Sequence, residues 1–188
     1  MRIDVHAHYW TDGYLDMLVD PGRSSTATQR GIGAGGGAEL DARLRLMVSA
    51  GVDMQVLSAA PQLPYGDDAA RAVAAACYVN DEYTALVSSH PDRFRAFAAT
   101  PMPHIDAAVA EMCRAIDELG MVGVTMNTSI LDRAITDPQF EPVFAELGAA
   151  PSCICIPSAM GRVRRWSATI TSPGWLGRPS RTPSPRCS

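Results

Sequence analysis

Two histidines near the amino terminus have the spacing of a metal-binding pair. His6 and His8 lie in the segment Ile3-Asp4-Val5-His6-Ala7-His8, where apolar and polar residues alternate as in a short β-strand. Side chains two residues apart on a strand project from the same face, so both imidazoles should lie at the carboxyl end of this strand. Two neutral imidazoles can hold a divalent cation when other elements supply further ligands. The alternative is a polar strand end with two incidental histidines, but the chain has only four histidines, which favours the metal site.

The remaining candidate ligands are weaker. His90 follows a predicted helix and His104 follows a proline-rich turn, so each is expected to be solvated or to cap a helix. Cys153 and Cys155 could contribute two thiolates, but no second pair accompanies them. The chain contains no lysine, which excludes a lysine Schiff base and a metal site bridged by a modified lysine. No catalytic side chain is assigned.

The bulk composition is that of an ordinary soluble protein. The 188 residues suit one domain, the hydrophobic fraction is 47%, and the formal net charge is -4. No apolar run is long enough to cross a bilayer, and Met1 leads directly into the first strand with no signal peptide. These features predict a cytoplasmic protein without a membrane partner. The five cysteines show no disulfide framework.

The elements that must position the histidines alternate between strands and helices. After the first strand, strands are expected at 54–58, 94–100 and 122–126, and helices at 39–50, 67–90, 105–119 and 137–147. The expected buried faces comprise Leu40, Leu44, Met47 and Val48 of the first helix and Phe140, Val143, Phe144 and Leu147 of the last. A loop over 11–38 ends in the glycine-rich run 31–37, which is predicted to be flexible rather than a phosphate loop. This order predicts an α/β protein with a parallel sheet.

Several motifs resemble those of the amidohydrolase superfamily. The Asp4 to His8 motif opens the series, and other stretches resemble the branch of aminocarboxymuconate-semialdehyde decarboxylase and related aromatic-acid decarboxylases. These stretches are Arg43-Leu44-Arg45-Leu46-Met47, Gly51-Val52-Asp53, Gln55 to Pro61, His90-Pro91-Asp92-Arg93-Phe94, Ala99-Thr100-Pro101-Met102-Pro103, Glu118-Leu119-Gly120, Gly123-Val124 and Phe140-Glu141-Pro142-Val143-Phe144. The match is collinear over residues 1 to about 150.

The resemblance implies a distorted (β/α)₈ barrel that holds one divalent metal, usually zinc, at the carboxyl ends of its strands. It implies non-oxidative decarboxylation of small carboxylated aromatic or muconate-like substrates, or hydrolysis of a small cyclic or amide substrate in other members. Family members are often homo-oligomers. The family metal shell also uses a histidine after strand five and an aspartate after strand eight, and a histidine after strand six serves in acid/base work. Only His6 and His8 have counterparts in this sequence, so a metal is expected to be weakly held or absent.

Residues 151–188 depart from the family pattern. This segment carries six arginines and no acidic residue, whereas residues 1–150 carry all 20 acidic residues. Translated in a shifted frame with permitted codons, Cys153 to Pro157 becomes HLHP, and Ala168 to Cys187 becomes DYHLTWLAGPPLEDTVAAL, which resembles the family segment after strand five. We therefore predict two parts: residues 1–150, the amino-terminal half of a barrel, and residues 151–188, an irregular tail of out-of-frame origin with at most one short strand. The expected chain is truncated and inactive or nearly so.

Two further interpretations remain open for the chain as a whole. It could be a non-catalytic fragment, because most of the expected site has no counterpart. The tail, with its charge of +6, could contact nucleic acid. The tail lacks interleaved aromatic residues and the rest of the chain is acidic, so no nucleic-acid partner is expected.

Overall fold

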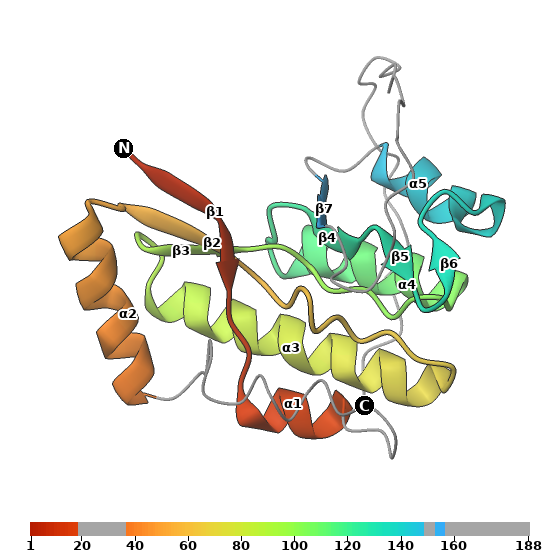
Figure 1. The fold of residues 1–188 in the computed structure, drawn as a ribbon, viewed down its shortest axis with the longest axis horizontal. Helices are drawn as coiled ribbons and strands as arrows, with labels where there is room; N and C mark the ends of the chain where they lie inside the picture. The colour runs from red at the N-terminus through yellow and green to blue at the C-terminus, as the bar shows by residue number, and fades with distance from the viewer. Residues whose placement is uncertain (19–36, 149–152, 157–188) are drawn as a thin grey trace.

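The computed structural model describes residues 1–18, 37–148 and 153–156, and its principal strands pair in parallel (Figure 1). The principal strands are β1 (Ile3–His8), β2 (Met54–Ser58), β3 (Phe94–Ala96), β4 (Val124–Asn127) and β7 (Cys153–Ile156). Their pairing is parallel in the order β1-β2-β3 and again in β4-β7. A parallel bridge between Ala98 and Val124 places β4 beside the chain that continues from β3. The predicted parallel, adjacent strands are therefore confirmed.

Helices connect these strands, as expected for β/α repeats. The helical segments are α1 (Asp12–Leu18), α2 (Gly37–Ala50), α3 (Ala69–Ser89), α4 (Ile105–Cys113), a π-helical turn (Arg114–Glu118), a 3₁₀ turn (Pro138–Phe140) and α5 (Glu141–Leu147). In Figure 1, α1 and α3 lie below the β1-β2-β3 sheet and α2 runs down its left side. The alternation of strands and helices, with helices packed on one face of the sheet, is that of part of a (β/α)₈ barrel. Within the described segments, no helix has the length and apolar character needed to cross a membrane.

Several boundaries differ from the sequence prediction. The stretch predicted as a loop over 11–38 contains α1, whose start is capped by Thr11: its hydroxyl accepts the backbone N–H of Tyr14 at 3.2 Å. The predicted strand 94–100 is regular only as far as Ala96. The polar loop after β4 contains a short antiparallel pair, β5 (Ser129–Ile130) with β6 (Arg133–Ala134). Most of the glycine-rich run lies outside the described residues. The same holds for the tail apart from β7, so the prediction of an irregular tail with at most one short strand lies outside what the structure describes.

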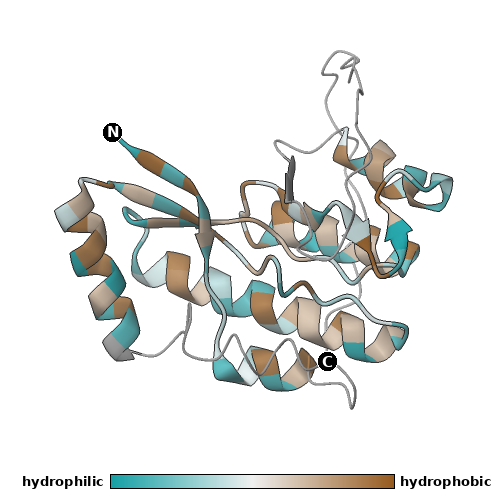
Figure 2. Cartoon of the chain, in the orientation of Figure 1, coloured by the Kyte–Doolittle hydropathy of each residue, from teal (hydrophilic) through white to brown (hydrophobic). Residues whose placement is uncertain are grey.

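Two predicted buried positions are wrong. Val48 is 70% exposed, although Met47 beside it is 2% exposed, because α2 buries only a narrow stripe. The alternating teal and brown bands along α2 in Figure 2 show that both kinds of residue occur around this helix. On α5, Phe144 is 36% exposed while Val143 is fully buried, as is Phe140 at the end of the preceding 3₁₀ turn. Both errors arise where two adjacent residues were assigned to one helical face.

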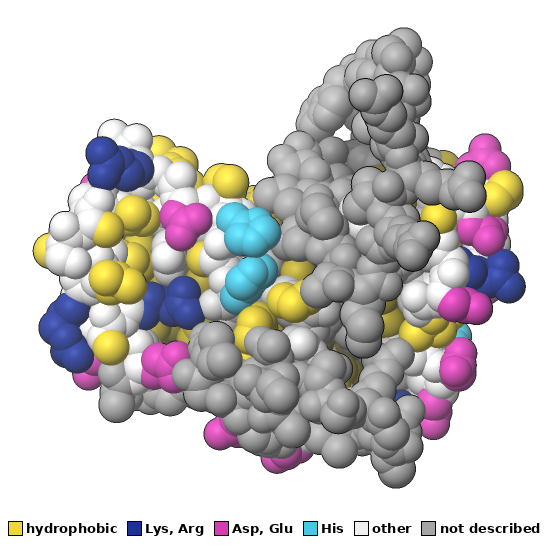
Figure 3. Space-filling model, viewed as in Figure 1, with side chains coloured by type: hydrophobic (Ala, Val, Ile, Leu, Met, Phe, Trp, Pro, Cys, Tyr) yellow, Lys and Arg dark blue, Asp and Glu magenta, His cyan; other side chains and the backbone are white. Residues whose placement is uncertain are grey.

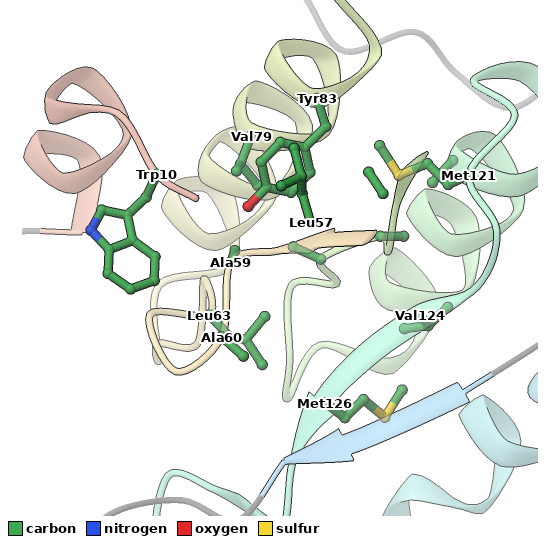
Figure 4. Packing of buried hydrophobic residues seen from close by; sticks show 14 of the residues in the cluster. Trp10, Leu57, Ala59, Ala60, Leu63, Val79, Tyr83, Met121, Val124 and Met126 are labelled. Carbon is green, nitrogen blue, oxygen red and sulfur yellow. The ribbon is translucent and has the colours of Figure 1, made fainter. Parts of the chain in front are cut away.

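The core lies between the sheet and the helices. Leu57 of β2, Val79 and Tyr83 of α3, and Val124 and Met126 of β4 are completely buried and belong to one cluster (Figure 4). Because β2 and β4 contribute side chains to the same cluster as α3, the helices and strands are packed as one body.

A buried polar network supplements this core where β3 ends. The Asn80 side chain accepts a hydrogen bond from Ala99 N at 2.9 Å and donates to Ala99 O at 2.9 Å. Its amide nitrogen also donates to Glu111 Oε1 at 2.7 Å, and Arg114 pairs with Glu111 at 2.8 Å. Asn80 therefore holds the chain after β3 against α3 and α4 at the same time.

Replacing Asn80 with leucine should destabilise the protein strongly. Asn80→Leu leaves the Ala99 amide groups and one Glu111 oxygen buried without this partner, at a cost of about 3 kcal/mol in the free energy of unfolding. Urea denaturation measures the difference. Ser89→Ala, at the exposed end of the same helix, is the control and should change stability by less than about 0.5 kcal/mol. A loss below about 1 kcal/mol in Asn80→Leu would contradict the assigned role.

A second polar contact joins the start of α1 to α3. The Thr11 hydroxyl donates to the Glu82 carboxylate, with oxygen–oxygen distances of 2.7 and 3.0 Å. Burial raises the pKa of Glu82 above its ordinary value of 4.5, while hydrogen bonds from Thr11 and Tyr78 act in the opposite direction. The folded protein therefore binds this proton more tightly than the unfolded chain does. The resulting stabilisation is present at low pH and is lost as pH rises through the raised pKa.

Glu82→Gln should consequently stabilise the protein at pH 7, because glutamine still accepts from Thr11 and has no charge to desolvate. Its advantage over wild type should shrink as the pH falls toward 4, where Glu82 becomes protonated in both states. Thermal unfolding between pH 4 and pH 7.5 gives the comparison. Asp41→Asn, at an exposed position of α2, serves as the charge-matched control. A pH-independent difference between Glu82→Gln and wild type would show that burial of the charge is not the cause.

Candidate metal site

The structure brings His6 and His8 together at the carboxyl end of β1. Their ring centroids lie 4.7 Å apart, with ring planes at 74°. The register between β1 and β2 shifts between Asp4 and Ala7, so β1 contains a bulge at His6 rather than strict alternation. Figure 3 shows histidine side chains gathered at one place on the surface over β1. The predicted juxtaposition is present, although its backbone is irregular.

His8 has the properties of a neutral imidazole at neutral pH. It is half-buried, and its Nδ1 atom is buried with no hydrogen-bond partner. Burial is the largest cause that lowers the pKa of His8, and His6 and Arg43 act in the same direction. Asp4 and a backbone hydrogen bond with Ala60 raise this pKa, but by less. A lowered pKa keeps the ring uncharged at neutral pH, which is the form that binds metals.

The spacing of the two rings fits a shared cation. At a metal–nitrogen distance of about 2.0–2.1 Å, each ring centroid would lie about 3 Å from the ion. Two such rings in tetrahedral positions would be separated by about 5 Å, close to the observed 4.7 Å. The pair therefore fits two positions of a divalent metal shell.

The described residues do not complete that shell. Within residues 1–18, 37–148 and 153–156, no group of three or more His, Cys, Asp or Glu side chains could hold a metal ion. His90 ends α3, where its backbone N–H bonds to Leu86 and Val87, and His104 precedes α4, with a ring nitrogen 2.8 Å from Gly66 O. His90 thus caps a helix, as expected, whereas the side chain of His104 contacts a loop carbonyl and forms no cap bond to α4. Cys153 and Cys155 fall on β7, and their side chains lie outside what the structure describes.

A cavity of about 580 Å³ lies beside the pair, between α2 and the first two strands. Its polar lining includes Asp4, Glu39, Arg43 and Gln55, and its apolar lining includes Leu46 and Met47. Sequence reasoning missed the polar group. Gln55, a large polar residue between Met54 and Val56 of β2, was the signal that could have indicated it.

Comparison with known proteins agrees with the fold. The amidohydrolase family model matches residues 3–152. The chain therefore belongs to the amidohydrolase family, and it is related to the aromatic acid decarboxylases within that family.

Two curated relatives and one solved structure illustrate the relationship. The 2-amino-3-carboxymuconate-6-semialdehyde decarboxylase of Dictyostelium discoideum is 33% identical over 58% of this chain and 32% of its own length. The gamma-resorcylate decarboxylase of a Rhizobium species is 39% identical over 46% of this chain and 27% of its own. The crystal structure of a Polaromonas dihydroxybenzoic acid decarboxylase, with bound manganese and the inhibitor 2-nitroresorcinol, has a TM-score of 0.63 at 28% identity.

These matches cover only part of each relative's own length. The structural match covers 79% of this chain and 46% of the Polaromonas enzyme. The chain thus spans about a third or less of the curated relatives and about half of this solved structure. The predicted family and the partial-barrel fold are confirmed.

Removing both imidazoles should abolish metal binding while sparing the fold. We expect the His6→Ala, His8→Ala double variant to show no Zn²⁺ or Mn²⁺ binding by isothermal titration calorimetry. Its unfolding free energy should fall by less than about 1 kcal/mol, because His6 is exposed and His8 half-buried. His90→Ala is the matched control and should bind as wild type does. Unchanged affinity in the double variant would place the metal elsewhere, with Cys153 and Cys155 the next candidates.

Proposed function

We propose that this chain contributes the amino-terminal part of a metal-dependent carboxy-lyase site for small aromatic or muconate-like acids. The observation that carries the proposal is the His6–His8 pair, 4.7 Å apart at the carboxyl end of a parallel strand. Support comes from the relatives, which are aminocarboxymuconate-semialdehyde and gamma-resorcylate decarboxylases. A cytoplasmic location, expected from the sequence, belongs to the same proposal.

The proposed cofactor is a divalent metal, with zinc favoured because imidazole nitrogen suits zinc. Manganese is the first alternative, since the Polaromonas relative holds that ion. When bound, such an ion supplies Lewis acidity that orients and polarises a substrate carboxylate. His6 and His8 would hold it, and the low pKa of His8 keeps one ligand ready without loss of a proton.

The two-histidine site predicts weak metal binding and little turnover. Catalytic zinc sites commonly use three protein ligands and leave one position open. Non-oxidative decarboxylation also requires a proton for the carbon that loses carbon dioxide, and none of the residues described at this site is assigned as that acid. A non-catalytic fragment is therefore the second candidate, favoured by the lack of a three-ligand cluster among the described residues.

We further propose that residues 151–188 are of out-of-frame origin. The abrupt change from acidic to arginine-rich composition supports this origin, and so does the family-like reading in the shifted frame. Hydrolysis of a small cyclic or amide substrate is the remaining alternative, since the family name covers such reactions.

Turnover measurements separate these candidates. We expect the purified 188-residue chain, loaded with Zn²⁺ or Mn²⁺, to release no measurable carbon dioxide from 2,6-dihydroxybenzoate, the acid bound in one solved relative. A gene in which the alternative frame is restored after Leu147 should regain metal-dependent decarboxylation. Hydrolysis of amide or lactone panels by the restored protein, without decarboxylation, would favour the hydrolase. Robust decarboxylation by the 188-residue chain itself would contradict the two-ligand account.

A further inference from the structure

We propose that Arg43, Gln55 and Asp4 form a hydrogen-bonded relay that positions the His6–His8 pair. Arg43 Nη2 donates to the His8 carbonyl oxygen at 2.7 Å, and Arg43 Nη1 donates to Gln55 Oε1 at 3.0 Å. Gln55 Nε2 donates to Asp4 Oδ2 at 3.0 Å, and Asp4 Oδ1 accepts from the backbone N–H of His6 at 3.0 Å. The relay thus begins at the backbone of one histidine and ends at the backbone of the other.

The position of the relay coincides with the place where the sheet ladder is irregular. The register between β1 and β2 shifts between Asp4 and Ala7, so regular strand pairing does not hold the backbone at His6. Asp4 satisfies the N–H of His6 and Arg43 satisfies the carbonyl of His8. Asp4 therefore holds the backbone where the ladder is irregular, and Arg43 holds it at His8, where pairing with Ser58 is regular again. Together they set the direction in which each imidazole leaves the strand.

The charges at the two ends define the orientation of the central amide. The side-chain oxygen of Gln55 accepts a hydrogen bond from the Arg43 guanidinium, and its side-chain nitrogen donates one to the Asp4 carboxylate. A flipped amide would point its nitrogen at the guanidinium and its oxygen at the carboxylate, which loses both bonds. Gln55 therefore has one favourable orientation and couples Arg43 on α2 to Asp4 on β1.

The planar fork of arginine suits this role better than another cation would. Two nitrogens of a single guanidinium contact the backbone of β1 and the side chain of β2 simultaneously, which a lysine ammonium does not reproduce with the same geometry. The guanidinium carbon of Arg43 also lies 5.6 Å from the centre of the Tyr9 ring, the residue that follows His8. The Arg43 guanidinium is thus held both by its hydrogen bonds and by its contact with the Tyr9 ring.

This inference rests on the proposed metal role of the pair, but its first test needs no metal. The chain has only four histidines, so a histidine-labelled sample gives a simple NMR spectrum in which His90 and His104 are internal controls for folding. Wild type should show a nuclear Overhauser cross-peak between the His6 and His8 rings, because their centroids are 4.7 Å apart. In Arg43→Met the cross-peak should fall about threefold or more, since its intensity varies with the inverse sixth power of distance and loss of support loosens a site by about 1 Å.

Two further variants separate positioning from general stability. Gln55→Glu keeps an acceptor for Arg43 but cannot donate to Asp4, so it should weaken the cross-peak as Arg43→Met does. Arg45→Met, on the exposed side of the same helix, should leave it unchanged. If Arg43→Met fails to fold, as judged by the His90 and His104 signals, Gln55→Glu decides the question. A wild-type cross-peak in folded Gln55→Glu and Arg43→Met proteins would overturn the relay.

Cobalt binding, followed by its visible absorption, provides the second readout. Arg43→Met and Gln55→Glu should bind Co²⁺ about 10-fold or more weakly than wild type, the usual effect of losing support behind metal ligands. Arg45→Met should match wild type. Absence of Co²⁺ binding by wild type would reject the proposed metal function, while the relay would still be judged by the cross-peak. Wild-type Co²⁺ affinity in both relay variants would overturn the relay alone.

Discussion

The parallel pairing of β1 with β2 is the constraint on which the site depends. It fixes Ile3 opposite Met54 and His8 opposite Ser58, so the histidines reach the carboxyl end of the sheet. The ladder continues past the pair, where Tyr9 N donates to Ser58 O at 3.2 Å. Regular pairing on both sides confines the bulge to the residues around His6. A displacement of β1 by one residue would therefore move both imidazoles and separate them from α2.

The same strand shows what a partial barrel exposes. On β1, Ile3 is 42% and Val5 52% exposed, although apolar side chains on barrel strands normally pack inside. On the other side of the sheet, α3 and the core cluster bury Leu57, Tyr83 and Phe94 completely. The packed side thus has a core of its own, while Ile3, Val5 and His6 of β1 are exposed. This contrast agrees with a chain that aligns with 46% of the Polaromonas structure.

Local patterns were sufficient to predict the parallel strands and the histidine pair, because alternation and helix punctuation are properties of neighbouring residues. Local patterns failed where contacts between residues far apart in the sequence determine the structure. Nothing near Asn80 in the sequence indicates that its side-chain amide bonds to the backbone of Ala99. Val48 was wrongly predicted to be buried, because the width of the buried stripe on α2 depends on the elements that pack against this helix. The link from Arg43 through Gln55 to Asp4 joins three separate segments, so no single motif contains it. The register shift between Asp4 and Ala7 was likewise not visible in the alternation of apolar and polar residues.

X-ray absorption spectroscopy of the zinc-loaded chain tests the central claim most directly, because it identifies the atoms bound to the metal. The account predicts a first shell of nitrogen and oxygen at about 2.0–2.1 Å, with the multiple-scattering pattern of two imidazoles and no sulfur. A zinc–sulfur contribution at about 2.3 Å, or a spectrum with no imidazole scattering, would contradict it, because the metal would then be bound by groups other than His6 and His8.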